Sequence, residues 1–186
     1  MGHSAAEHAV VREHGGGGLM SRRPDGVEVV LEAIIGRLLR DQELTLAVAE
    51  SCTGGLIGHR ITEVPGSSRY FRGSITAYAY DVKETLLSVS RETLDKHGAV
   101  SAPTAREMAE GVRQVVGADI GISATGIAGP SGGTPEKPVG LVYLGLVAGD
   151  GVWVESEVFE GDRWENKAAS AEAALDMLRR YLQGSL

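Results

Sequence analysis

Hydrophobic and polar positions follow two periods along the chain, one typical of helices and one typical of strands. Apolar residues at helical spacing predict helices over residues 27–39, 54–63, 81–87, 103–116 and 163–182. Apolar runs bounded by small or turn-forming residues predict strands over residues 44–50, 73–79, 120–124, 139–148 and 151–159. Gly149-Asp150-Gly151 joins the last two strands and indicates a hairpin.

This order of elements predicts the fold class. Helices alternate with strands before the hairpin, so we expect an α/β fold: a single three-layer α/β/α domain with a mixed, mostly parallel sheet over residues 26–186. The chain has 186 residues, 42% of them hydrophobic, which is enough for one compact core. Residues 1–25 contain few apolar positions and a run of four glycines, so we expect a disordered N-terminal extension there.

Charge and composition narrow the classes of partner. The formal net charge of −7 argues against a broad nucleic-acid surface, which needs clustered Lys and Arg. No apolar run reaches the roughly 18 residues that span a bilayer, so we expect a cytoplasmic protein with no membrane partner. The single cysteine, Cys52, cannot form an internal disulfide, and no Cys/His cluster has zinc-ligand spacing. We therefore expect neither a metal nor another cofactor.

The first candidate site follows the strand predicted over 44–50. Ser51, Cys52 and Thr53 lie where that strand ends, and Gly54 and Gly55 open the next helix. Unpaired backbone N–H groups point outward at such a junction, so a side chain there can attack a carbonyl while nearby amides hold the oxyanion. Two other readings remain open at this point: Ser51 or Thr53 simply caps the helix, or the Cys52 thiol is the nucleophile.

A glycine-rich segment forms the second candidate site. Thr125, Gly126 and Gly129 directly follow the strand predicted over 120–124, and Lys137 lies a few residues further on. A loop of this kind at the carboxyl end of a strand offers successive N–H groups to an anion, although it can also be only a turn. Neither the P-loop nor the dinucleotide-binding fingerprint is present.

Tyr78 and Lys83 supply the third candidate site. They lie at the end of one predicted strand and in the helix after it. A lysine accepts a serine proton only if burial or a neighbouring cation lowers its pKa; otherwise Lys83 is a solvated lysine and Tyr78 a core residue. The S-x-x-K arrangement is absent because Gly54 stands three residues after Ser51, and the G-x-S-x-G motif is absent too.

Together these segments resemble the CinA C-terminal domain family over about residues 27–183. Seven motifs occur here in the family's order. They are Ala49–Gly55, Gly66-Ser67-Ser68, Tyr78 with Lys83, His97–Ser101, Gly126–Pro130 with Gly132-Gly133, Lys137–Gly140, and Gly161-Asp162-Arg163.

The resemblance implies an amidohydrolase that converts nicotinamide mononucleotide to nicotinic acid mononucleotide and ammonia in pyridine-nucleotide salvage. Carried over by position, Ser51 matches the family's nucleophile and Lys83 its base, with Tyr78 beside them. Thr125 matches a hydroxyl position near the site, and Arg163 matches an arginine suited to a phosphate. The resemblance leaves open whether the turn at 53–55 or the loop at 126–133 takes that phosphate.

Three positions depart from the family pattern, namely Ala102, Tyr80 and Lys167. Tyr80 stands where an asparagine is common, and Lys167 where a second arginine often follows Gly-Asp-Arg. These two departures put substrate contacts in doubt, but neither the nucleophile nor the base. The alternative function is a non-catalytic nucleotide-binding or regulatory module of the competence- and damage-inducible type. Family members commonly associate, so we expect a homo-oligomer.

Overall fold

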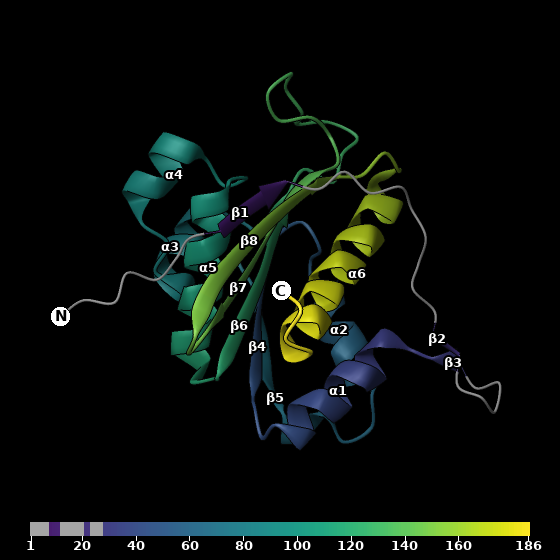
Figure 1. Cartoon of the computed structure of the whole chain (residues 1–186). Helices are drawn as coiled ribbons and strands as arrows, with labels where there is room; N and C mark the ends of the chain where they lie inside the picture. Colours follow the sequence, from purple (N-terminus) through teal and green to yellow (C-terminus); the bar gives the residue numbers. More distant parts are fainter. Residues whose placement is uncertain (1–7, 12–20, 23–27) are drawn as a thin grey trace.

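The computed structural model describes residues 8–11, 21–22 and 28–186, and its main feature is a six-stranded mixed sheet (Figure 1). The strand order is β1-β8-β7-β6-β4-β5. Three neighbouring pairs are parallel (β1–β8, β4–β6 and β4–β5) and two are antiparallel (β6–β7 and β7–β8). These strands are β1 (His8–Val11), β4 (Leu46–Glu50), β5 (Phe71–Thr76), β6 (Ile120–Gly126), β7 (Leu141–Ala148) and β8 (Gly151–Val158).

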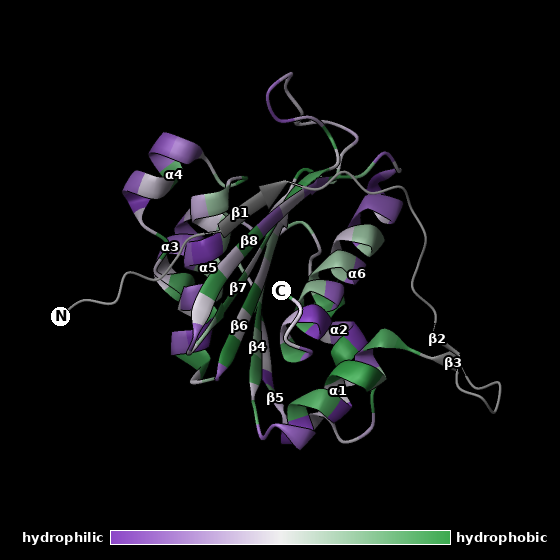
Figure 2. Cartoon of the chain, in the orientation of Figure 1, coloured by the Kyte–Doolittle hydropathy of each residue, from purple (hydrophilic) through white to green (hydrophobic). Residues whose placement is uncertain are grey.

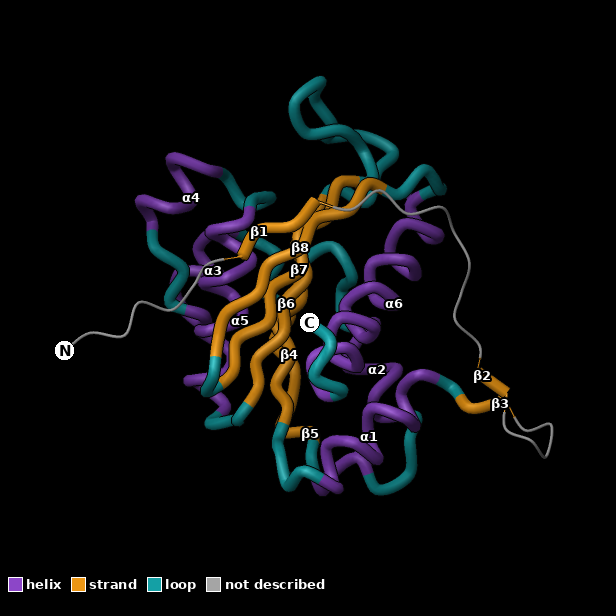
Figure 3. The backbone as a smooth tube through the Cα atoms, viewed as in Figure 1, coloured by secondary structure: helices purple, strands orange, loops and turns teal. Residues whose placement is uncertain are grey.

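Within the described residues, six α-helices cover the sheet in two layers. Figure 3 shows helices on both sides of the strands. On one face lie α1 (Leu31–Asp41), α2 (Leu56–Thr62) and α6 (Arg163–Leu182). On the other lie α3 (Tyr80–Leu87), α4 (Arg91–His97) and α5 (Ala102–Val116). A short 3-10 helix, η1 (Ser67–Arg69), precedes β5, and a separate two-stranded ribbon joins β2 (Ser21–Arg22) to β3 (Glu28–Val29). The predicted three-layer fold with a mixed, mostly parallel sheet is confirmed.

Each face of the sheet has its own hydrophobic core, because side chains alternate along every strand. Leu46 and Val48 of β4 point toward α1, α2 and α6, whereas Ala47 and Ala49 pack against Leu87 and Met108 on the opposite side. All five residues of β4 are buried, as expected for a central strand covered on both faces. Figure 2 accordingly shows much green along the central strands β6 and β7, whereas α4, at the outside, is largely purple.

Element boundaries differ from the expected ones at a few places. Helix α6 begins and ends as predicted, but α1 begins at Leu31 and not at 27. Helix α4 was not predicted, because its seven residues bury only Leu94 and their hydrophobic period is too weak to be recognised. Its N-terminus is instead defined by Ser90, whose hydroxyl accepts a hydrogen bond from the Thr93 N–H.

The proposed N-terminal extension falls mostly outside the described residues. Of residues 1–25, the structure describes β1, which pairs in parallel with β8, and β2. The prediction of disorder over 1–25 is therefore not tested. Within the described residues, no helix is both long and apolar enough to cross a membrane.

The close packing of α5 against the end of α3 gives a first prediction. A Cβ placed on Gly111, in the middle of α5, would lie 1.8 Å from the carbonyl oxygen of Leu87. In an open helix Gly→Ala stabilises by about 1 kcal/mol, but here the clash reverses the sign. We expect Gly111→Ala to destabilise the domain by about 3 kcal/mol in chemical denaturation.

The matched control is Gly149→Ala in the β7–β8 hairpin, where no atom lies within 4 Å of the added Cβ. This variant should unfold like the parent protein. A Gly111→Ala variant as stable as the parent would contradict the packing of α3 against α5.

Candidate functional site

The candidate site lies where three parallel strands end. Glu50, the last residue of β4, is in register with Thr76 of β5 and Ala124 of β6. The Ser51 N–H donates to the Ala124 carbonyl at 2.9 Å, and the Ala77 N–H donates to the Glu50 carbonyl at 2.8 Å. The carboxyl edge of the sheet therefore brings together the residues after β4 and β5, which are far apart in sequence.

Lys83 and Ser51 meet at this edge. The Lys83 Nζ donates to the Ser51 Oγ at 3.0 Å and to the carbonyls of Ala77 at 2.6 Å and Tyr78 at 3.3 Å. Lys83 has no solvent-exposed surface, so it is not the solvated lysine that the sequence left open. A neutral amine has two protons and one lone pair. With its protons on the two carbonyls, the lone pair of Lys83 would face Ser51.

Burial changes the protonation of this lysine. It lowers the pKa of the Lys83 amine from 10.5 to about 8, because the charged form loses its hydration; the Cys52 sulfur opposes part of this shift. With a pKa near 8, about one lysine in ten is neutral at pH 7. A lysine that is partly neutral near physiological pH can accept a proton from a serine.

Glu50 shapes the turn that carries Ser51. Its carboxylate is fully buried and accepts four hydrogen bonds. The donors are the Thr53 hydroxyl at 2.7 Å and the backbone N–H groups of Gly55 at 2.9 Å, Ile57 at 3.1 Å and Gly58 at 2.9 Å. The first N–H groups of α2 are thus already bound to a negative charge of the protein itself. This role of Glu50 was not predicted, although an acidic residue directly after the apolar residues Leu46–Ala49 was a signal for one.

The occupied N–H groups limit which amides are open to a substrate. The Gly54 N–H donates to the Ser51 carbonyl at 3.2 Å, and the Gly55 N–H is bound by Glu50. Among the described residues, no oxygen accepts a hydrogen bond from the N–H of Cys52 or Thr53. Of the amides from Cys52 to Gly55, these two remain as candidate oxyanion donors.

Cys52 lies beside the same amides but is a poor thiolate. Burial raises the pKa of its thiol to about 11, outweighing the N–H groups of Cys52 and Thr53 and the nearby Lys83, which lower it. The side chain is 5% exposed and is part of the core on the α2 face. At neutral pH this thiol is protonated, which disfavours it as a nucleophile.

Tyr78 and Arg163 form a second cluster next to the lysine. The Tyr78 ring is 62% exposed, so it is not the core residue that the sequence left open. Its hydroxyl accepts a hydrogen bond from the Arg163 guanidinium at 3.2 Å, and Arg163 also donates to the Gly129 carbonyl at 2.7 Å. Arg163 thereby joins the start of α6 to the segment after β5 and to the glycine-rich loop.

The other candidates from the glycine-rich segment hold the loop in place. The Thr125 hydroxyl donates to the Ala99 carbonyl at 2.7 Å, and Gly126 is the last residue of β6. The Lys137 ammonium donates to the carbonyls of His97 at 2.6 Å and Val100 at 2.7 Å. The structure gives none of these three a hydrogen bond to Ser51 or Lys83 in the described part of the chain.

Two hollows open near the site, and Trp164 lines both of them. The first, of about 290 Å³, is lined by Thr53, Gly54, Gly55, Leu56, His59, Trp164 and Lys167. The second, of about 570 Å³, is lined by Ala128, Pro130, Val139, Gly161, Asp162, Arg163 and Trp164. Neither Trp164 nor the approach of Lys167 to the Ser51 turn was predicted, because α6 follows that turn by more than a hundred residues.

No group of three or more His, Cys, Asp or Glu residues that could hold a metal ion is present in the described ranges.

Tyr80, one of the departures from the family pattern, accepts a hydrogen bond from the Ala99 N–H at 3.1 Å through its hydroxyl. It therefore supports the segment that precedes α5.

The comparisons with known proteins agree with this arrangement. The family model described as "CinA C-terminal domain" matches residues 28–182. A competence-damage inducible protein of Halothermothrix orenii is 55% identical over 159 residues, which are 85% of this chain but 38% of that protein. The chain thus spans about two-fifths of the length of the curated relatives that it matches.

Solved structures show the same fold. The competence/damage inducible protein CihA of Agrobacterium tumefaciens is 40% identical with a TM-score of 0.77, over 82% of this chain and 95% of that one. A CinA superfamily protein of Klebsiella pneumoniae is 29% identical with a TM-score of 0.80, over 83% and 96% of the two chains. By sequence and by structure, this chain belongs to the CinA C-terminal domain family.

Proposed function

We propose that this domain is an amidohydrolase that converts nicotinamide mononucleotide to nicotinic acid mononucleotide and ammonia. The observation that carries the proposal is the buried Lys83 amine, 3.0 Å from the Ser51 hydroxyl. A binding module needs no such pair. Burying a lysine costs free energy, and an activated hydroxyl is what covalent catalysis requires.

In the proposed reaction, neutral Lys83 takes the Ser51 proton as the oxygen attacks the carboxamide carbon. The carbonyl oxygen becomes an oxyanion held by the N–H groups of Cys52 and Thr53, each worth about 3 kcal/mol. Protonated Lys83 then gives its proton to the amide nitrogen, and the C–N bond breaks to release ammonia. This leaves an ester between the nicotinoyl group and Ser51.

Water completes the cycle. Lys83 takes a proton from water, the hydroxide adds to the ester carbon, and the second tetrahedral intermediate collapses as Lys83 returns a proton to Ser51. The collapse restores the Ser51 hydroxyl and the neutral amine, and the carboxylic acid that forms releases its proton to solvent and leaves as the carboxylate. The deciding assay is ammonia release from nicotinamide mononucleotide by the purified chain. Nucleotide binding without ammonia release would instead support the regulatory module.

The identity of the nucleophile is tested by replacing Ser51 and Cys52 with alanine in separate variants. We expect Ser51→Ala to lower kcat by about 10⁴-fold or more, because no attacking oxygen remains. Cys52→Ala should keep kcat and cost about 1 kcal/mol of stability through lost packing. Ammonia release that survives Ser51→Ala and disappears with Cys52→Ala would assign the nucleophile to the thiol.

The pH dependence follows from the pKa of Lys83. A base must be neutral, and with a pKa of about 8 the neutral fraction rises roughly tenfold per pH unit up to that value. We expect kcat/KM to rise with pH below about 8 and to level off above it.

Lys83→Arg is the matched variant, because a guanidinium keeps the hydrogen bonds but stays protonated. It should lose about 10²–10⁴-fold in kcat while the protein remains folded. A flat pH profile between 6 and 9, or an active Lys83→Arg variant, would rule out Lys83 as the base.

The role of Glu50 is tested by Glu50→Gln. Glu50 Oε1 accepts from the Gly58 N–H, and Oε2 accepts from Thr53 and Gly55. Whichever oxygen the NH2 group replaces, a donor then faces another donor, and hydrogen bonds of the turn are lost. We expect kcat to fall while KM changes little, with about 1–3 kcal/mol of stability lost.

Asp119→Asn provides the control at the opposite end of β4. The Asp119 carboxylate accepts hydrogen bonds from the Thr45 N–H at 2.8 Å and the Thr45 hydroxyl at 2.6 Å, away from the site. This variant should lose stability without losing kcat, both measured at a temperature where every variant is folded. Equal kcat in Glu50→Gln and the parent would limit Glu50 to a structural role.

A further inference from the structure

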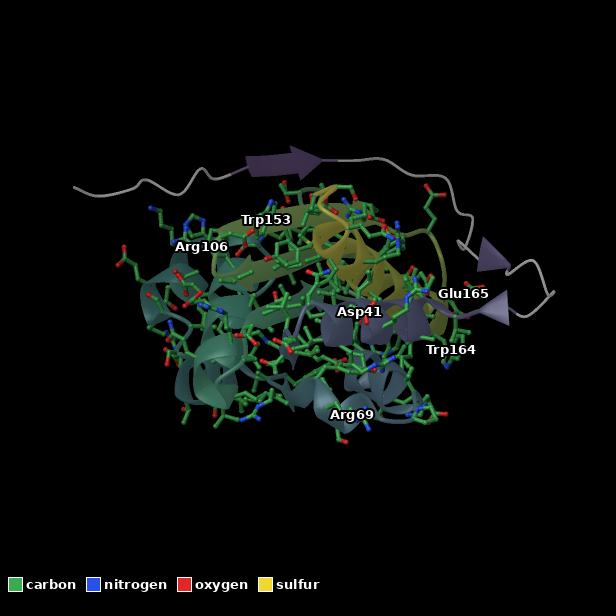
Figure 4. The ribbon with its side chains drawn as sticks, turned by 60° about the horizontal axis from the view of Figure 1, so that its bottom comes forward. Asp41, Arg69, Arg106, Trp153, Trp164 and Glu165 are labelled. Carbon is green, nitrogen blue, oxygen red and sulfur yellow. The ribbon has the colours of Figure 1, made fainter. Side chains whose placement is uncertain are left out.

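The hollow beside the Ser51 turn is lined by residues that the proposed chemistry does not use. Trp164 and Lys167 of α6 form one side, and Gly54 and Gly55 form the other. The Trp164 side chain is 76% exposed, and Figure 4 shows it with Glu165 at the outer edge of the molecule. A large aromatic residue at the wall of a hollow supplies apolar contact area for a ligand.

Lys167 is the unpaired cation of this region. It is partly buried, and the described residues offer its ammonium neither a hydrogen-bond acceptor nor a carboxylate within ion-pair distance. By contrast, Arg163 is bonded to Gly129 and Tyr78, and Lys137 to two backbone carbonyls. A partly buried charge without a partner is costly, and an anionic ligand would remove that cost.

The position of Lys167 places it next to the nucleophile turn. Its Nζ lies 3.4 Å from the point where a Gly54 side chain would begin. The Gly54 N–H in turn donates to the carbonyl of Ser51. Glycine at position 54, with a φ of +63°, therefore leaves room for the ammonium against the turn.

The charges around the hollow favour an anion held by side chains. No acidic residue lines it, and the Glu50 carboxylate, which lies behind Thr53 and Gly55, already accepts hydrogen bonds on both of its oxygens. The backbone N–H groups of Gly55, Ile57 and Gly58 do not bind the anion, because they already donate hydrogen bonds to the Glu50 carboxylate. The neighbouring hollow is lined by the Asp162 carboxylate and by Arg163, whose guanidinium already donates to the Gly129 carbonyl and the Tyr78 hydroxyl.

We infer that this hollow is the subsite for the phosphate monoester of the mononucleotide, with Lys167 as its cationic ligand and Trp164 as its apolar wall. The inference rests on the proposed function for the identity of the nucleotide. It assigns the phosphate to the side of the Ser51 turn and not to the glycine-rich loop at 126–133.

Binding is measured by calorimetry in the Ser51→Ala background, so that no turnover is needed. The probes are nicotinamide mononucleotide and nicotinamide riboside, which lacks the phosphate. We expect Lys167→Met to weaken mononucleotide binding by about 10- to 100-fold, the loss of one charge-assisted hydrogen bond, and to leave riboside binding unchanged. Lys167→Arg should retain most of the affinity.

The control is Lys96→Met, which removes an exposed lysine of α4 and the same net charge. It should bind both probes like the Ser51→Ala parent. Inorganic phosphate should compete with the mononucleotide in that parent and compete less in the Lys167→Met variant. In a Trp153→Phe background, the fluorescence of Trp164, the remaining tryptophan, should change when either mononucleotide or phosphate binds.

The outcomes separate this inference from the proposed function. If mononucleotide binding requires Lys167 but the protein with Ser51 intact releases no ammonia, the subsite stands and the proposed reaction fails. If ammonia is released but Lys167→Met binds mononucleotide like its parent, or loses riboside binding equally, the subsite is wrong. Absence of mononucleotide binding to the Ser51→Ala protein also overturns the subsite.

Discussion

The site depends on one buried carboxylate at the end of the central strand. Glu50 is committed to the donors of the turn that follows, and these four hydrogen bonds determine where α2 begins and how Ser51 leaves the sheet. A buried carboxylate is stable only when its oxygens are satisfied in this way. Because the protein fills the N-terminus of α2 with its own negative charge, recognition of an anionic substrate must come from side chains.

The same edge of the sheet explains why a lysine can lie so deep in the protein. Ala77 and Tyr78 follow β5 with carbonyls that accept from the Lys83 amine, and Ser51 follows β4 on the third side. Because β4 and β5 are parallel neighbours, Ser51 lies close to Ala77 and Tyr78 although these residues are far apart in the sequence. Burial lowers the pKa of the amine while its hydrogen bonds remain. Part of the lysine is therefore neutral near physiological pH, as a base must be.

Much of the architecture could be predicted from hydrophobic periods. The strands 44–50 and 120–124 and the helix 163–182 were recognisable because their apolar residues face a core, and the junction at Ser51 followed from their order. Helix α4 was not recognisable, because a short polar helix with one buried leucine has almost no period. The role of Glu50 and the approach of Lys167 to Gly54 depend on tertiary contacts that no local pattern encodes.

For Tyr78 and Lys83, the sequence supplied the residues but not their environment. Taken as an isolated pair, they favoured a solvated lysine and a core tyrosine, and the structure has the reverse, with the lysine buried and the tyrosine exposed. The arrangement of Arg163 has a consequence for how this surface responds to change. One guanidinium donates hydrogen bonds to both the Tyr78 hydroxyl and the Gly129 carbonyl. Substitution of Arg163 would therefore release the segment after β5 and the glycine-rich loop together. Such a variant would change ligand contacts and the positions of these two segments at the same time.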